Sequence, residues 1–286
     1  MGRLFQLRHD GSIWQYTGTP MSGWEQLDNN PTATAIVANS NDLYQFHSDG
    51  SIWQYTGTPM SGWQQIGSNN ISTRTIVTGS SASSGLYQLH SNGSIWRYTG
   101  TPLTGWQQID NNASTREIIA DNDGNLYQLH NDGNVWQYTG TPNTGWEQID
   151  NNTTTKAFVV GASAGASLYQ LHTNGSIWHY TGTPHTGWEQ LDENKAATAI
   201  AAGANLYQLH NNGSIWQYTG TPHTGWQQIG NNNMSTRAIV TDNEGNLYQL
   251  HTNGSIWQYP GTPGADWQQL DDNAGTIAIV ATIAPA

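Results

Sequence analysis

The sequence predicts an all-β fold: a seven-bladed β-propeller, a closed ring of seven blades with four antiparallel strands each. Three observations predict it. A pair of tryptophans recurs seven times along the 286 residues. Each repeat contains four short strand-like runs separated by turn signals. No window has the apolar spacing of an amphipathic helix. Together they indicate one domain, residues 1–286, built from repeats of about 41 residues.

The tryptophan repeat sets the period. An Ile-Trp or Val-Trp pair occurs seven times, at intervals of 38 to 43 residues, and a second Trp follows ten residues after each first Trp. An aromatic residue, such as Phe5 or Tyr44, precedes each first Trp by nine residues. The two series account for all 14 tryptophans. The first series is Trp14, Trp53, Trp96, Trp136, Trp178, Trp216 and Trp257.

Four strands, A to D from axis to rim, are expected in each repeat. In the second repeat they are residues 35–37 (small and apolar, suited to a crowded axis), 43–47, 51–56 and 63–66. Between strands B and C stands Asp49-Gly50, or Asn-Gly in other repeats, which supplies the positive φ angles of a tight hairpin turn. Larger length differences are confined to the A–B connection, where a surface loop tolerates them.

The two ends of the chain are each an incomplete blade. The chain begins on a B strand, residues 4–9, and ends on an A strand, residues 276–281. Together they supply one whole blade. The last strand is therefore expected to pair with the first and close the ring, which also removes an open sheet edge.

The repeat resembles that of the tectonin and tachylectin-type β-propeller lectins, and it is similar to seven-bladed bacterial lectins. In the last repeat the matching residues are 238–240, Gly245, 247–248, Asn253-Gly254, 256–259 and 267–270. The match covers essentially the whole chain, once per blade. The resemblance implies shallow sugar-binding pockets between neighbouring blades, up to seven in all, with glycans of glycoproteins or cell surfaces as partners.

Composition narrows the function classes. Only eight residues are basic, no stretch of sequence gathers them, and the net charge is −12, which argues against a nucleic-acid partner. There is no cysteine, so disulfides and thiolate metal sites are excluded. No apolar segment is long enough to insert into a membrane, and no signal peptide is recognisable. A monomeric cytoplasmic protein is expected, with secretion by a non-classical route left open.

The candidate ligand-binding residues are the Tyr at the end of strand C and the second Trp. A C–D hairpin brings the two rings together, and sugars stack their C–H faces on aromatic rings. Packing between blades is the alternative role, and the first Trp is assigned mainly to that. The candidates are Tyr16, Trp24, Tyr55, Trp63, Tyr98, Trp106, Tyr138, Trp146, Tyr180, Trp188, Tyr218, Trp226, Tyr259 and Trp267.

No cofactor or metal is expected. A histidine ends strand B in each repeat (read as His9 in the first and His47 in the second), and its expected role is to cap the turn. The turns 121–125 and 242–246 carry acidic residues in a pattern like that of calcium loops, but they lack the later bidentate Glu. Ordinary acidic turns are the preferred interpretation.

Three function classes have to be distinguished. A multivalent lectin is the leading hypothesis, because identical sites are what avidity uses. A protein-interaction scaffold, or a recently amplified or designed repeat without a selected ligand, is the alternative. An enzyme is not expected: the acidic residues, such as Asp28 and Asp110, are scattered, and the axial strands carry mainly Ala, Ile, Val and Thr.

Overall fold

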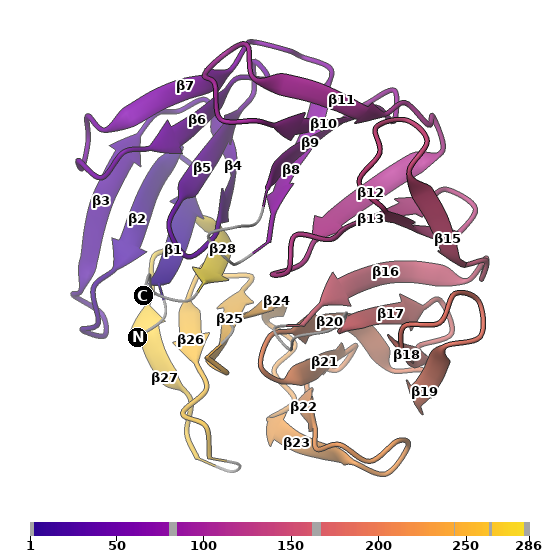
Figure 1. Cartoon of the computed structure of the whole chain (residues 1–286). Helices are drawn as coiled ribbons and strands as arrows, with labels where there is room; N and C mark the ends of the chain where they lie inside the picture. Colours follow the sequence, from indigo (N-terminus) through magenta and orange to yellow (C-terminus); the bar gives the residue numbers. More distant parts are fainter. Residues whose placement is uncertain (1–2, 80–84, 162–166, 243, 263–264, 283–286) are drawn as a thin grey trace.

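The protein is a ring of seven four-stranded antiparallel sheets, as predicted (Figure 1). The structure is a computed structural model that describes residues 3–79, 85–161, 167–242, 244–262 and 265–282. In six sheets the strands follow chain order from axial strand A to rim strand D, and in the first sheet strand A is the last strand of the chain. The described part of the chain contains no helix with the length and apolarity needed to span a membrane.

The strands are as follows, in the order A, B, C, D. Blade 1 has β28 (Thr276–Thr282), β1 (Arg3–Arg8), β2 (Ser12–Tyr16) and β3 (Trp24–Asn29). Blade 2 has β4 (Ala33–Ala38), β5 (Leu43–His47), β6 (Ile52–Tyr55) and β7 (Trp63–Gly67). Blade 3 has β8 (Thr73–Thr78), β9 (Leu86–His90), β10 (Ile95–Tyr98) and β11 (Trp106–Asp110). Blade 4 has β12 (Thr115–Ala120), β13 (Leu126–His130), β14 (Val135–Tyr138) and β15 (Trp146–Asp150). Blade 5 has β16 (Thr155–Val160), β17 (Leu168–His172), β18 (Ile177–Tyr180) and β19 (Trp188–Asp192). Blade 6 has β20 (Ala197–Ala202), β21 (Leu206–His210), β22 (Ile215–Tyr218) and β23 (Trp226–Gly230). Blade 7 has β24 (Thr236–Thr241), β25 (Leu247–His251), β26 (Ile256–Gln258) and β27 (Gln268–Asp271).

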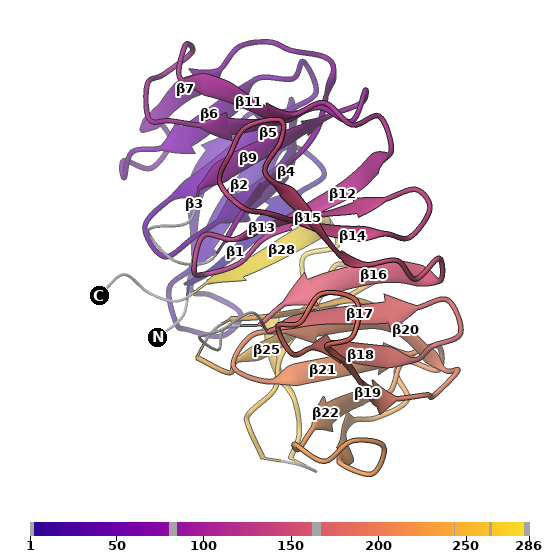
Figure 2. The same cartoon turned by 45° about the vertical axis from the view of Figure 1, so that its right-hand side comes forward.

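The ring is closed by its two ends, which confirms the prediction from the incomplete terminal blades. β28 pairs antiparallel with β1, from Arg3 opposite Thr282 to Arg8 opposite Thr276. Figure 2 shows β28 lying beside β1 although the two strands stand at opposite ends of the chain. Closure gives β1 the same axial neighbour that strand B has in every other blade.

The B–C turns are built from short local hydrogen bonds. In blade 5, the side-chain oxygen of Asn174 accepts hydrogen bonds from the backbone N–H and hydroxyl of Ser176. The indole N–H of Trp178 then donates to the Ser176 hydroxyl at 3.0 Å. Gly175 between them has a φ of 86°. An Asx turn of this kind fixes the start of strand C and the plane of its Trp.

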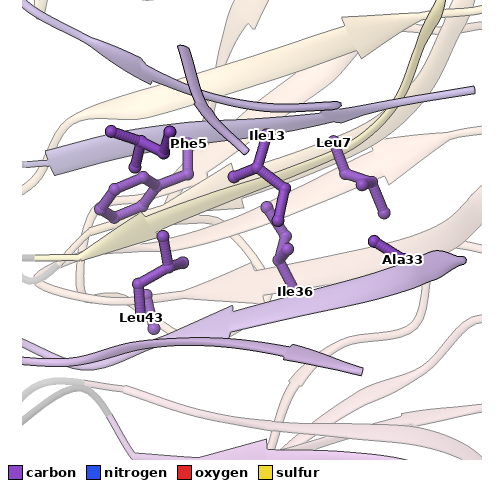
Figure 3. Packing of buried hydrophobic residues seen from close by; sticks show 8 residues of the cluster. Phe5, Leu7, Ile13, Ala33, Ile36 and Leu43 are labelled. Carbon is purple, nitrogen blue, oxygen red and sulfur yellow. The ribbon is translucent and has the colours of Figure 1, made fainter. Parts of the chain in front are cut away.

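The hydrophobic core lies between blades. Figure 3 shows Phe5, Leu7 and Ile13 of blade 1 pointing toward Ala33, Ile36 and Leu43 of blade 2. These side chains are at most 6% exposed. Comparable clusters join the other neighbouring blades. Each blade therefore buries its apolar face against the next, and no blade has a core of its own.

A pair of hydrogen bonds, here called the rim clamp, joins neighbouring blades at the outside. In blade 5 the indole N–H of Trp188 and the backbone N–H of His185 both donate to one acceptor, the Ile149 carbonyl of blade 4, at 3.0 and 2.8 Å. The indole bond recurs at all seven interfaces, from the second Trp to the preceding strand D. The backbone bond recurs at six of them among the described residues.

Gly175, in the B–C turn of blade 5, lies against the backbone of the segment that connects β19 to β20, and its substitution tests this contact. A Cβ at Gly175 would lie 2.3 Å from the Asn194 backbone oxygen. Gly175→Ala should therefore lower the free energy of unfolding by about 3 kcal/mol or more in urea titrations, since strain at positive φ and a backbone clash add.

Gly182→Ala is the matched control. Gly182 also has a positive φ, 97°, but a Cβ there would meet nothing within 4 Å. Its cost should be about 1 kcal/mol. Equal costs for the two variants would contradict the close approach.

Candidate functional site

At three interfaces a cleft lies between rim strand D of one blade and strands B and C of the next. The cleft between blades 4 and 5 is a cavity of about 300 Å³. Its aromatic walls are Trp178 and Trp188, and His185 stands at its lip. Corresponding residues line cavities of about 180 Å³ between blades 2 and 3 and about 310 Å³ between blades 6 and 7. The cleft is thus a feature of the repeat.

The floor of this cleft is a buried polar network. Gln170 donates from Nε2 to the Asp150 carboxylate of the preceding blade at 2.9 Å. Its Oε1 accepts from the Thr155 hydroxyl at 3.1 Å and lies 2.9 Å from His172 Nε2. The His172 ring stacks on Trp178, with centroids 5.8 Å apart and an interplanar angle of 21°. Two aromatic walls therefore stand over fixed donors and acceptors.

Several floor atoms have no hydrogen-bond partner among the described residues. Between blades 1 and 2 they are Gln45 Oε1 and His47 Nε2, and between blades 5 and 6 they are Gln208 Oε1 and His210 Nε2. All four side chains are buried. A buried polar atom without a partner costs about 1–3 kcal/mol, so the floor of these two interfaces carries a local cost in stability.

The floor histidines are held neutral by burial. Desolvation lowers the pKa of His47, as it does for the equivalent histidines of blades 3 to 7. A neutral imidazole has one donor and one acceptor nitrogen, which matches the two roles of a hydroxyl group. The site is therefore suited to neutral polar ligands at pH 7.

The clefts are not all equivalent. Strand D ends in an Asp carboxylate in five blades but in Gly67 and Gly230 in blades 2 and 6. Gln88 and Gln249 lack that partner and keep the hydrogen bonds from Thr73 and Thr236, which are equivalent to the bond from Thr155 to Gln170. The lip residue also changes around the ring, from Met21, Met60 and Leu103 to Asn143, His185 and His223. Each lip residue has a φ of 64 to 67°.

The structure brings together each predicted Tyr–Trp pair. Ring centroids of the seven pairs lie 5.0 to 5.4 Å apart. Of these residues, the second Trp lines the three clefts described, as Trp106, Trp188 and Trp267. The Tyr does not line them. Tyr138 instead lines a separate cavity of about 380 Å³ with Tyr87, Arg97 and Glu147.

The first Trp has a larger part in the cleft than the sequence suggested. It was assigned mainly to packing, but Trp96, Trp178 and Trp257 are half-buried and line their clefts. The floor residues Gln170 and His172 were not among the candidates either. The signal that could have found them is the invariant spacing Gln-x-His on strand B in blades 2 to 7.

One histidine was placed in the wrong register. His9 is exposed and lies beyond β1, and the residue equivalent to His47 is Arg8. Arg8 takes the place of the histidine on the aromatic wall, with its guanidinium 4.3 Å from the ring centroid of Trp14. It also forms an ion pair with Asp271 of blade 7 at 3.6 Å. The interface between blades 7 and 1, where the ring closes, therefore carries a permanent cation at the position that His47 occupies in blade 2.

The calcium-like turns are structural. The Asp121 carboxylate accepts hydrogen bonds from the backbone N–H groups of Asp123 and Asn125 and from the Asn125 side chain. Asp242 has the corresponding bonds to Glu244 and Asn246, while residue 243 lies outside the described residues. No group of three His, Cys, Asp or Glu suited to a metal ion occurs among the residues described.

No protein-family model matches the sequence, and no curated protein matches it. The fold is shared. A streptogramin B lyase superposes with a TM-score of 0.62 at 17% identity, over 90% of this chain and 87% of that one. YCF48 bound to D1 peptide gives 0.60 at 15% identity, over 85% and 84%. SapL1 lectin in complex with alpha methyl fucoside gives 0.51 at 14% identity, over 85% and 97%. At such identities the likeness is one of fold alone.

The buried histidines predict that acid destabilises the fold. Their folded pKa lies below the unfolded value of about 6.5, so the unfolded chain takes up protons first as the pH falls. The free energy of unfolding should therefore decrease from pH 7 to 5.5, measured by urea titration. Glu117 and Asp242, whose pKa values burial raises, act in the opposite sense but are only two groups.

His172→Asn should show a shallower decrease over this pH range, because one of the six histidines no longer titrates. A free energy of unfolding that increases from pH 7 to 5.5 would contradict the burial of these histidines in their neutral form.

Blade 4 offers a test of the turn that holds the first Trp. It has Asn134 where six blades have Ser, and Trp136 Nε1 is buried without a partner among the described residues. Asn134→Ser should add about 0.5–1.5 kcal/mol to the free energy of unfolding by restoring the hydrogen bond.

The reciprocal change Ser214→Asn in blade 6 should remove the hydrogen bond from Trp216, which is 3.1 Å long, and lower stability by a similar amount. If both variants changed the free energy of unfolding in the same direction, the stabilising role of the Ser–Trp hydrogen bond would be refuted.

Proposed function

We propose that this protein binds carbohydrates in the clefts between its blades, as a multivalent lectin of the tectonin and tachylectin type. The observation that carries the proposal is the cleft between blades 4 and 5. There, two tryptophan rings stand over Asp150, Gln170 and His172, which present charged and neutral hydrogen-bonding groups. An aromatic wall over a polar floor fits a molecule with a C–H face and several hydroxyl groups.

The size of the cleft supports a monosaccharide or the end of a glycan chain. A cavity of about 300 Å³ is at the small end of ligand pockets. Among proteins of similar fold, SapL1 lectin is seen with alpha methyl fucoside. That sugar is a reasonable first probe, because it has an apolar methyl group and three hydroxyl groups. The proposal includes no catalytic step.

Repetition would give the protein useful affinity. Individual sites of this size bind weakly, but linked sites that engage a glycan-coated surface together gain by avidity. The variable floor and lip residues mean that the clefts would differ in strength. The cytoplasmic location and monomeric state expected from the sequence stay predictions.

A protein-interaction role is the second candidate. The lips of three consecutive clefts carry Met21, Met60 and Leu103, which are 47 to 51% exposed. Flexible apolar side chains of this kind suit peptide side chains as well as sugars. YCF48, of similar fold, is seen with a peptide. A repeat without a selected ligand is the remaining alternative.

A glycan array followed by ¹⁹F NMR tests the proposal. Protein labelled with 5-fluorotryptophan is titrated with alpha methyl fucoside and with each sugar that is positive on the array. The resonances of Trp178 and Trp188 should shift and saturate together. In Trp178→Leu the Trp188 shift should be lost, since losing a stacking ring costs about 1–3 kcal/mol.

Trp178→Phe is the matched control, because a phenyl ring still offers an aromatic plane, and the Trp188 response should persist. If no sugar on the array shifts any tryptophan resonance, carbohydrate binding is excluded. If both variants respond like the unchanged protein, the ligand lies elsewhere.

A further inference from the structure

We propose that one mouth of the axial channel is a binding site for a tetrahedral oxyanion, a phosphate or sulfate group, held by Arg74, Arg116, Lys156 and Arg237. These are four of the eight basic residues of the chain. They are 42, 40 and 81 residues apart in sequence, but they occupy the same position in β8, β12, β16 and β24. This site is separate from the clefts and does not depend on carbohydrate binding there.

The common position is a β-bulge near the start of each axial strand. In β8, Thr73 pairs with His90 and Thr75 with Leu89, so Arg74 is the extra residue. The same shift occurs in all seven axial strands. Symmetry therefore places the extra residues at one level around the axis. They are Thr34, Arg74, Arg116, Lys156, Thr198, Arg237 and Ile277.

Two of the four cations reach across to neighbouring strands at this level. Arg116 donates from Nη2 to the carbonyls of Thr155 and Lys156, at 2.7 and 3.0 Å. Lys156 donates from Nζ to the Thr198 carbonyl at 2.9 Å. These bonds run from blade 4 to blade 5 and from blade 5 to blade 6. These two side chains are thus held around the circumference of the mouth, and Arg74 and Arg237 are exposed at the same level.

The mouth has one nearby carboxylate, Glu117, although acidic residues are in excess over the chain as a whole. Among the described residues, no carboxylate lies within 4 Å of any of the four cations, whereas Arg8 has such a partner. Glu117 is the one acidic residue on the axial strands, and it is partly buried beside Arg116. Its pKa is raised by burial, and Arg116 and Arg74 oppose that shift. The mouth is therefore a positive ring on a protein of net charge −12.

This arrangement selects the chemical class of ligand. Three guanidinium groups can donate paired hydrogen bonds to oxyanions, and an ammonium group adds a fourth cation. The channel beyond is apolar: Val77, Val160 and Val240 are among the residues that line a cavity of about 360 Å³ at the far ends of the axial strands. A charged group would therefore stop at the mouth and not enter the channel.

Calorimetry with inorganic pyrophosphate at low ionic strength tests the site. The variants take their residue from the protein itself, since Thr34 and Thr198 occupy the bulge in blades 2 and 6. Arg74→Thr/Arg237→Thr should raise the Kd about tenfold, and the fourfold Thr variant should abolish binding. Arg97→Gln is the control: it removes a rim cation, Gln stands there in five other blades, and binding should be unchanged.

Three further titrations, with inorganic sulfate, galactose 6-sulfate and galactose, distinguish a free oxyanion from a sulfated sugar as the ligand. Binding of both sulfates identifies the oxyanion itself as the ligand, and binding of galactose 6-sulfate alone identifies a sulfated sugar. Either supports the site if the fourfold variant abolishes it. No binding of any anion at low salt, equal binding by the fourfold variant, or loss of binding in Arg97→Gln would overturn the proposal.

Discussion

The rim clamp is the interaction on which the rest of the structure depends. One backbone carbonyl of strand D accepts hydrogen bonds from an indole N–H and a backbone N–H of the next blade. Two donors on one acceptor fix both the distance and the angle between blades at the rim. The apolar clusters between blades are not directional. The clamp supplies the direction that aligns each blade with the next beside the clefts.

The clamp also explains the strained lip residue. A non-glycine residue with positive φ costs of order 1 kcal/mol or more, and methionine or leucine gains nothing from that conformation. The backbone N–H of the lip residue is one of the two clamp donors, so the conformation is held by the interface and not by the side chain. The side chain is consequently free to vary, and it stands at the opening of a cleft. Met60 and His185 thus have the same backbone conformation but chemically different side chains.

The two sites have opposite electrostatic character. The clefts combine aromatic walls with neutral histidines and, in five blades, an Asp carboxylate, a setting that favours neutral hydroxyl-bearing ligands. The axial mouth gathers positive charge at a β-bulge, a feature that re-aims side chains. Both arise from the same repeat. The clefts combine tryptophans that all blades share with lip and floor residues that vary, whereas the axial bulge position, which holds Arg, Lys, Thr or Ile, forms the positive ring.

The sequence by itself determined the number of blades, the order of the strands and the closure by β28, because hydrophobic period, turn residues and repeat spacing are local properties. It also placed the Tyr55–Trp63 pair, since one hairpin joins the two residues. It assigned Trp178 mainly to packing and His172 to capping the turn, because their place in the cleft depends on a neighbouring blade. Only the tertiary structure decided that Arg74 and Arg237 share one mouth, because residues far apart in the chain meet there only when the ring closes.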